Sequence, residues 1–69
     1  MTVAKVLELI GNSTISWEDA TKQAIVEASK TVRSIKAVNV KRFSAKVENN
    51  EIVEYRAVVK VVFVVQRED

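Results

Sequence analysis

Residues 52–66, IVEYRAVVKVVFVVQ, decide the fold of this chain. Every second side chain in this stretch is apolar, which predicts a β-strand with one unbroken apolar face. That face comprises Val53, Tyr55, Ala57, Val59, Val61, Phe63 and Val65. Val58, Val62 and Val64 make the other face apolar as well, which is typical of a strand that is buried on both sides. At about 3.3 Å per residue, the strand would span about 50 Å.

A second strand precedes this one and is expected to form a hairpin with it. Residues 37–47 alternate with a period of two, which predicts a strand with two mixed faces. We expect the odd-numbered residues from Ala37 through Phe43 to Val47 on one face and the even-numbered residues from Val38 to Lys46 on the other. Residues 48–51, Glu-Asn-Asn-Glu, supply the turn because Asn tolerates a positive φ.

The N-terminal part predicts a first strand followed by a helix start. Residues 3–10 are short and rich in branched side chains, and we expect this strand to stop at Gly11, the only glycine. Residues 11–14 are small and polar and predict a turn. Ser16 is the expected N-cap of the helix, with Asp19 three residues later in a capping-box arrangement.

The helix is expected to span residues 17–33, with a buried face made mostly of alanine. This face recurs every three or four residues and comprises Trp17, Ala20, Ala24, Ala28 and Val32. Acidic residues in the first turn and the basic residues Lys30 and Arg33 in the last turn would interact favourably with the helix dipole. The small alanines would let the helix lie very close to a sheet.

These elements predict an α+β fold in the order β-α-β-β, with a three-stranded antiparallel sheet curled around one helix. A chain of 69 residues predicts a single domain, residues 1–69. With no Cys or His, neither a disulfide nor an ordinary zinc site can support so small a core. A helix of about 25 Å cannot cover a strand of about 50 Å. We therefore predict a homo-oligomer in which the ends of the long strands pack on neighbouring subunits.

Composition argues against several classes of partner. The formal net charge is +2 and the basic residues are scattered, so we expect no binding to nucleic acid. The longest apolar run, residues 61–65, is far shorter than the roughly 20 residues of a membrane span, so we expect no membrane association. The expectation is a soluble, cytoplasmic protein.

Few residues are suited to catalysis, and we expect that the protein is not an enzyme. The sequence lacks His, Cys and a glycine-rich phosphate loop. Glu8 is interpreted as a surface or interface charge and Lys60 as a solvated or salt-bridged one. Trp17 is interpreted as a core or interface residue that closes the helix start against the sheet.

The assembled pattern resembles the dodecin family. The resemblance rests on residues 5–13, KVLELIGNS; on residues 16–20, SWEDA; on the helix end ASKTVR; and on Glu54-Tyr55-Arg56 with residues 61–63, VVF. It covers residues 3–66 and depends on the order and spacing of these segments. Dodecins are hollow homododecamers, and many of them bind flavins in pairs between subunits. The resemblance thus implies a cage that binds or stores a small molecule, with riboflavin or FMN as the expected cofactor.

The resemblance also implies which positions would contact a flavin. The family's ring-stacking Trp corresponds to Ala37, and the Gln that hydrogen-bonds the ring corresponds to Arg56. Val64 stands where some members carry a basic residue near the ligand phosphate. Because these positions are substituted, we expect flavin binding to be weak or lost. The alternative is a structural or calcium-binding assembly, since some relatives without the Trp are associated with calcium; no metal site can be located from the sequence.

Overall fold

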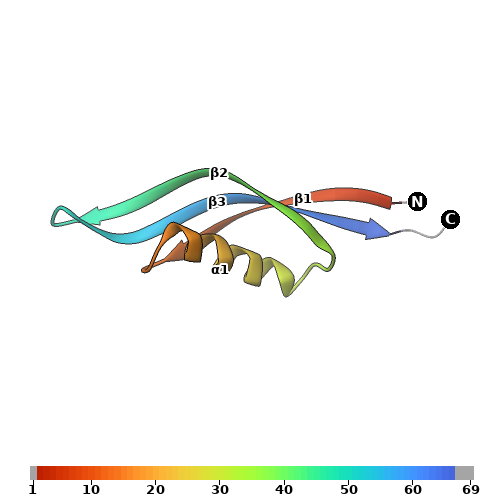
Figure 1. Cartoon of the computed structure of the whole chain (residues 1–69), viewed down its shortest axis with the longest axis horizontal. Coiled ribbons are helices and arrows are strands. Elements are labelled where there is room, and N and C mark those ends of the chain that lie inside the picture. Colours follow the sequence, from red (N-terminus) through yellow and green to blue (C-terminus); the bar gives the residue numbers. More distant parts are fainter. Residues whose placement is uncertain (1, 67–69) are drawn as a thin grey trace.

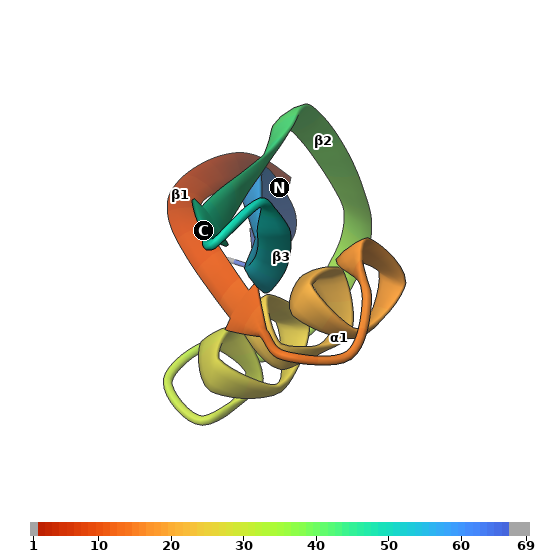
Figure 2. The ribbon, with the colours of Figure 1, turned by 90° about the vertical axis from the view of Figure 1, so that its left-hand side faces the viewer.

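The computed structural model describes residues 2–66 and has the predicted β-α-β-β order. Strand β1 (Thr2–Ser13) leads to helix α1 (Trp17–Ser29), and strands β2 (Ile35–Glu48) and β3 (Glu51–Gln66) follow. The three strands form one antiparallel sheet in the order β1-β3-β2, with α1 against one face (Figure 1). Figure 2, which looks along the sheet, shows the strands coiling over one side of α1. The predicted fold class is therefore confirmed.

Strand β3 occupies the centre of the sheet and runs beyond α1 at both ends (Figure 1). At the end near the chain termini, residues 64–66 of β3 pair only with β1. At the hairpin end, the segment 51–54 of β3 pairs only with β2. The molecule is 57 Å long, whereas a helix of 13 residues measures about 20 Å. Both ends of the sheet are consequently two-stranded ribbons with no helix over them, an arrangement that is marginally stable by itself in water.

The two faces of β2 differ from the prediction because the strand contains bulges. Lys36 and Lys41 are extra residues at two of the three register shifts between β2 and β3. A bulge advances the strand by one unpaired residue, so the side chains beyond Lys41 exchange faces. The side toward α1 therefore carries Val38 and Val40 before the bulge and Phe43 and Ala45 after it, in register with apolar residues of β3. The mixed faces seen in the sequence are thus an apolar and a polar face interrupted by a bulge.

The core is a close contact between the alanine face of α1 and the centre of β3. Ala20, Ala24 and Ala28 are buried against Ala57, Val59 and Val61, with side chains of β1 and β2 packed around them. The alanine prediction is confirmed: with methyl side chains only, α1 lies directly on the sheet.

Gly11 does not end β1, contrary to the prediction, because the strand continues through it to Ser13. A Cβ atom at this position would lie 1.9 Å from the carbonyl oxygen of Ala20 and 3.1 Å from Cβ of Ala24. The φ of Gly11 is not positive, so a turn conformation is not the reason for glycine here. The backbone of α1 occupies the space in which a side chain would stand.

The start of α1 was predicted correctly, and its end was not. The Ser16 side chain caps the helix by accepting a hydrogen bond from the Asp19 amide at 3.0 Å. The reciprocal half of the predicted capping box is replaced by Ser13, whose hydroxyl accepts from the Ser16 amide and donates to the Asp19 carboxylate. The helix ends at Ser29 rather than at residue 33, so Lys30 is the C-cap and Arg33 lies outside. The Thr31 hydroxyl donates to the Ala28 carbonyl, and such side-chain bonds compete with the helical pattern for the backbone carbonyls. β-branched residues at 31 and 32 also disfavour another turn.

The hairpin turn has the predicted residues and conformation. Asn49 and Asn50 both have positive φ, 52° and 63°, which corresponds to the two-residue type I′ turn. Among residues 2–66, no helix is long and apolar enough to cross a membrane.

Candidate functional site

Both predicted ligand positions lie on the sheet face that points away from α1, which we call the open face. Residues 57, 59 and 61 of β3 face the helix, so the even-numbered residues of β3 and their direct partners on β1 and β2 share the other face. The open face comprises Ala4, Val6, Glu8, Ile10 and Asn12 of β1; Ala37, Asn39, Arg42, Ser44 and Lys46 of β2; and Glu54, Arg56, Val58, Lys60, Val62 and Val64 of β3.

Ala37 lies at the end of the open face near the chain termini. It is exposed and pairs with Val62, whose partner on β1 is Val6. Val64 is half-buried, and its amide donates to the Ser34 carbonyl at 3.2 Å. This end of the open face presents small aliphatic side chains: the Ala37 methyl supplies no ring for stacking, and Val64 supplies no charge.

Arg56 lies toward the hairpin end of the open face, between Asn12 of β1 and Ser44 of β2. Its Nε atom donates to Oε1 of Glu54 at 2.9 Å, and both side chains remain partly exposed. The guanidinium therefore has a neutralising carboxylate two residues away on its own strand. A ligand that uses Arg56 as a cation must compete with Glu54.

The structure does not bring Ala37 and Arg56 together within one chain. Ala37 pairs with Val62 of β3, and Arg56 lies six residues from Val62 on the same strand. The two positions are therefore about 20 Å apart. A ring system is much shorter than this, so a ligand that contacts both positions would have to lie between two copies of the chain. The open face supplies both halves of such a site, one at each end.

Charged residues separate the two ends of the open face. Glu8 accepts a hydrogen bond from Lys41 Nζ at 3.2 Å, and Lys60 lies opposite Glu8 in the register. All three side chains are exposed. Glu8 is thus a surface charge, as predicted, and Lys60 an exposed one, while Lys41 reaches Glu8 across the central strand because it belongs to a bulge.

On the sheet face toward α1, opposite the open face, an aromatic cluster joins the start of α1 to the hairpin. The ring of Trp17 meets that of Tyr55 edge-on, with centroids 4.9 Å apart, and lies 6.1 Å from that of Phe43. Its Nε1 atom donates to the Ser44 carbonyl at 2.8 Å. Trp17 therefore closes the helix start against the sheet as predicted, although 37% of it remains exposed.

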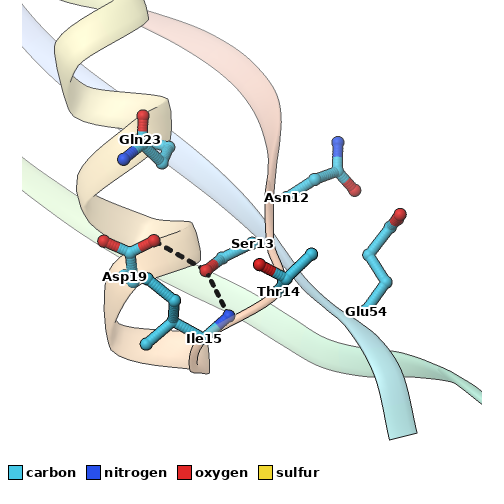
Figure 3. A pocket seen from close by; sticks show the side chains of 7 residues that line it. All are labelled: Asn12, Ser13, Thr14, Ile15, Asp19, Gln23 and Glu54. Atoms are coloured by element: carbon cyan, nitrogen blue, oxygen red, sulfur yellow. Dashed lines mark hydrogen bonds between the residues drawn. The ribbon is translucent and has the colours of Figure 1, made fainter.

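An open hollow of about 360 Å³ lies beside the β1–α1 connection, where no site was predicted (Figure 3). Ser13 is buried in its wall; its hydroxyl donates to Asp19 Oδ2 at 2.6 Å and accepts a hydrogen bond from the Ile15 amide at 2.9 Å. The Asn-Ser-Thr run at 12–14 was interpreted only as a turn, and only the tertiary structure adds Glu54 to it. The residues that line the hollow are Asn12, Ser13, Thr14, Ile15, Asp19, Gln23 and Glu54.

The hollow does not contain the donor set of a typical calcium site. Its two carboxylates, Asp19 and Glu54, already accept hydrogen bonds from Ser13 and Arg56. Within residues 2–66 there is no group of three or more acidic, His or Cys side chains that could hold a metal ion. Calcium takes six to eight oxygen ligands, so one chain offers an incomplete set here.

Comparison with solved structures shows that this fold is shared with several dodecins. A variant of the Thermus thermophilus dodecin is 30% identical with a TM-score of 0.91, and the match covers 97% of this chain and all of that one. The calcium dodecin of Mycobacterium tuberculosis, described as a calcium-chelating antigen, is also 30% identical, with a TM-score of 0.81 and coverage of 97% and 96%. The Streptomyces coelicolor dodecin shares the fold at 21% identity, with a TM-score of 0.91 and coverage of 97% and 96%.

Comparison of the sequence with protein families gives the same result. No curated protein matches the chain. The sequence model of the dodecin family, however, matches residues 3–66, which is nearly the whole chain and includes every helix and strand described above except Thr2, the first residue of β1. The chain belongs to the dodecin family.

Proposed function

We propose that the chain, acting as one domain over residues 1–69, assembles into a hollow homododecamer that binds a small molecule between its subunits. The observation that carries this proposal is the apolar surface beyond both ends of α1. Val3, which pairs with Val65 beyond the point where β2 begins, is 39% exposed at one end of the sheet, and Val47 and Ile52 are 58% and 46% exposed at the other. Two-stranded ribbons with exposed branched side chains gain stability when a neighbouring subunit covers them.

The proposed ligand site lies where two open faces meet, with the Ala37 end of one subunit near the Arg56 end of another. Flavin is the ligand that the family resemblance implies, but the side chains at these positions do not fit it by stacking. Loss of an aromatic platform costs roughly 1–3 kcal/mol per ring, or about 5- to 150-fold in affinity. We therefore propose a binding assembly without catalytic activity in which riboflavin and FMN bind weakly or not at all.

Light scattering coupled to size-exclusion chromatography tests the assembly. Twelve chains of 7.7 kDa give a particle of about 92 kDa. A monodisperse species near this mass supports the proposal. A stable monomer of one chain mass at micromolar concentration would refute it, because the exposed ends of the sheet would then need no partner.

Flavin titration tests the ligand part separately. We expect no saturable quenching of riboflavin or FMN fluorescence by the natural chain, and quenching by the double variant Ala37→Trp/Arg56→Gln. Ala37→Leu/Arg56→Gln is the matched control, since it adds bulk without an aromatic ring. Saturable micromolar binding by the natural chain would show that Ala37 is compatible with the site.

A structural or calcium-binding assembly is the second candidate. Two observations favour it: the 30% identity to a calcium dodecin, and the hollow, six of whose seven side chains carry oxygen atoms. Because one chain supplies only two carboxylates there, a second subunit would have to complete the ligand set. A rise in melting temperature with calcium that a chelator reverses, and that Glu54→Gln abolishes, would support calcium binding; melting curves that are identical with calcium and with chelator would exclude calcium binding.

A further inference from the structure

The two outer edges of the sheet differ in a way that bears on how copies of the chain meet. On the edge formed by β2, the register with β3 shifts three times. A lysine accompanies each shift: Lys36 and Lys41 are the extra residues of two bulges, and Lys46 directly precedes the third irregularity. Bulges and lysines are the features with which natural sheets prevent an edge from pairing with another strand.

The edge formed by β1 has neither feature along most of its length. Its 12 residues pair with β3 without a single register shift. The side chains flanking the outer edge include Val6 and Ile10, which are 57% and 61% exposed. A long, regular strand with exposed apolar side chains and a free row of backbone amides and carbonyls is a site for strand addition.

We propose that β1 pairs with β1 of a second copy, antiparallel and across a two-fold axis, so that two sheets become one sheet of six strands. A second copy is the occupant because β1 is the regular edge available on another subunit, the β2 edge being bulged. Pairing of β1 with β1 is isologous and therefore closes on itself. It leaves only lysine-bearing edges outside, which explains how the chain can associate without forming fibres. The inference rests on the proposed self-association and specifies one contact within it.

Charge restricts the register of this pairing. In an antiparallel pair across a two-fold axis, the residue on the axis faces its own copy. Registers centred on Lys5 or Glu8 would place like charges directly opposite each other, which is destabilising. Among the other registers, the one centred on Leu7 pairs the most residues of β1, because residues 2–12 then face residues 12–2 of the second copy. The two copies of Val6 are diagonal neighbours in this register, about 7–8 Å apart.

Cysteine cross-linking tests this geometry because the sequence contains no cysteine. In the assembled protein, Val6→Cys treated with a short bis-maleimide is expected to convert nearly all of the monomer band on a denaturing gel into a dimer. Asn39→Cys is the matched control, since Asn39 is also exposed and lies on the open face but belongs to β2. The Asn39→Cys variant is expected to give no cross-link and to run as the monomer band on the denaturing gel.

Hydrogen exchange separates strand pairing from mere side-chain contact. The outward-pointing amides of residues 3–10 are expected to exchange on the order of 100-fold more slowly than those on the outer edge of β2. Cross-linking at residue 39 equal to that at residue 6, rapid exchange along β1, or slow exchange there without cross-linking between copies would each overturn the proposal. An intact particle near 92 kDa without a Val6→Cys cross-link would refute the edge pairing alone, whereas a cross-linked species of only two chains would refute the dodecamer alone.

Discussion

Replacement of Gly11 by alanine tests the contact on which the packing of α1 depends. The added Cβ would lie 1.9 Å from the carbonyl oxygen of Ala20, whereas an unstrained carbon–oxygen contact is about 3.3 Å. Helix and strand would have to separate by about 1.4 Å at this point. A gap of that size removes at least a quarter to a half of the dispersion energy between facing atoms, here along the buried alanines of α1.

The expected cost of Gly11→Ala is about 3 kcal/mol, at the upper end of the range for overpacked cores. A chain of this length has a total stability of about 3–10 kcal/mol, so the variant would lose a large part of it. The measurement is denaturant unfolding followed by the fluorescence of Trp17, the only tryptophan, at matched protein concentrations.

Two further variants make the prediction specific. Asn12→Ala changes the neighbouring, exposed position of β1 and is expected to alter stability by no more than about 0.5 kcal/mol. Ala20→Gly combined with Gly11→Ala is not expected to restore stability, because the clash is with the carbonyl oxygen of residue 20 and not with its methyl group. A Gly11→Ala variant within about 0.5 kcal/mol of the natural chain, or rescue by Ala20→Gly, would refute the reasoning.

Three other substitutions have expected outcomes that denaturant unfolding can check. Trp17→Phe removes the Nε1 bond to Ser44 but keeps an aromatic ring on Tyr55, so a loss of about 1 kcal/mol is expected, against about 3 kcal/mol for Trp17→Ala; equal losses would contradict this. Asn50→Gly should be neutral or stabilising, whereas Asn50→Ala should cost about 1 kcal/mol, because φ is 63° there. Ser16→Ala removes the acceptor of the Asp19 amide and should cost about 1 kcal/mol; unchanged stability would contradict the capping role.

Local sequence signals predicted those parts of the fold that short-range physics controls. The capping serine, the alanine face and the Asn-Asn turn each depend on residues within a few positions of one another, and each was predicted correctly. The helix end was wrong because its apolar period continues to Val32, while side-chain hydrogen bonds from Ser29 and Thr31 to helix carbonyls come first. A period count does not include that competition.

The candidate site was less accessible from sequence because it depends on register. A strict alternation assigns Phe43 and Ala37 to the same face, yet the bulge at Lys41 separates them. No local signal distinguishes Lys41 from the other lysines of β2, since a bulge arises from the match between two strands. For the same reason, the proximity of Glu54 to the residues of the β1–α1 connection could not be anticipated.

By itself, the sequence determined the order of the elements, the alanine contact between helix and sheet, and a last strand too long for its helix, because each follows from the spacing of apolar side chains along the chain. Only the tertiary structure showed that the backbone of α1 leaves no room for a side chain at Gly11. It also determined which residues of β2 share the open face and placed Ala37 and Arg56 about 20 Å apart. These properties depend on how separate segments approach and align. The distance between the two positions is what makes a site containing both a property of more than one chain.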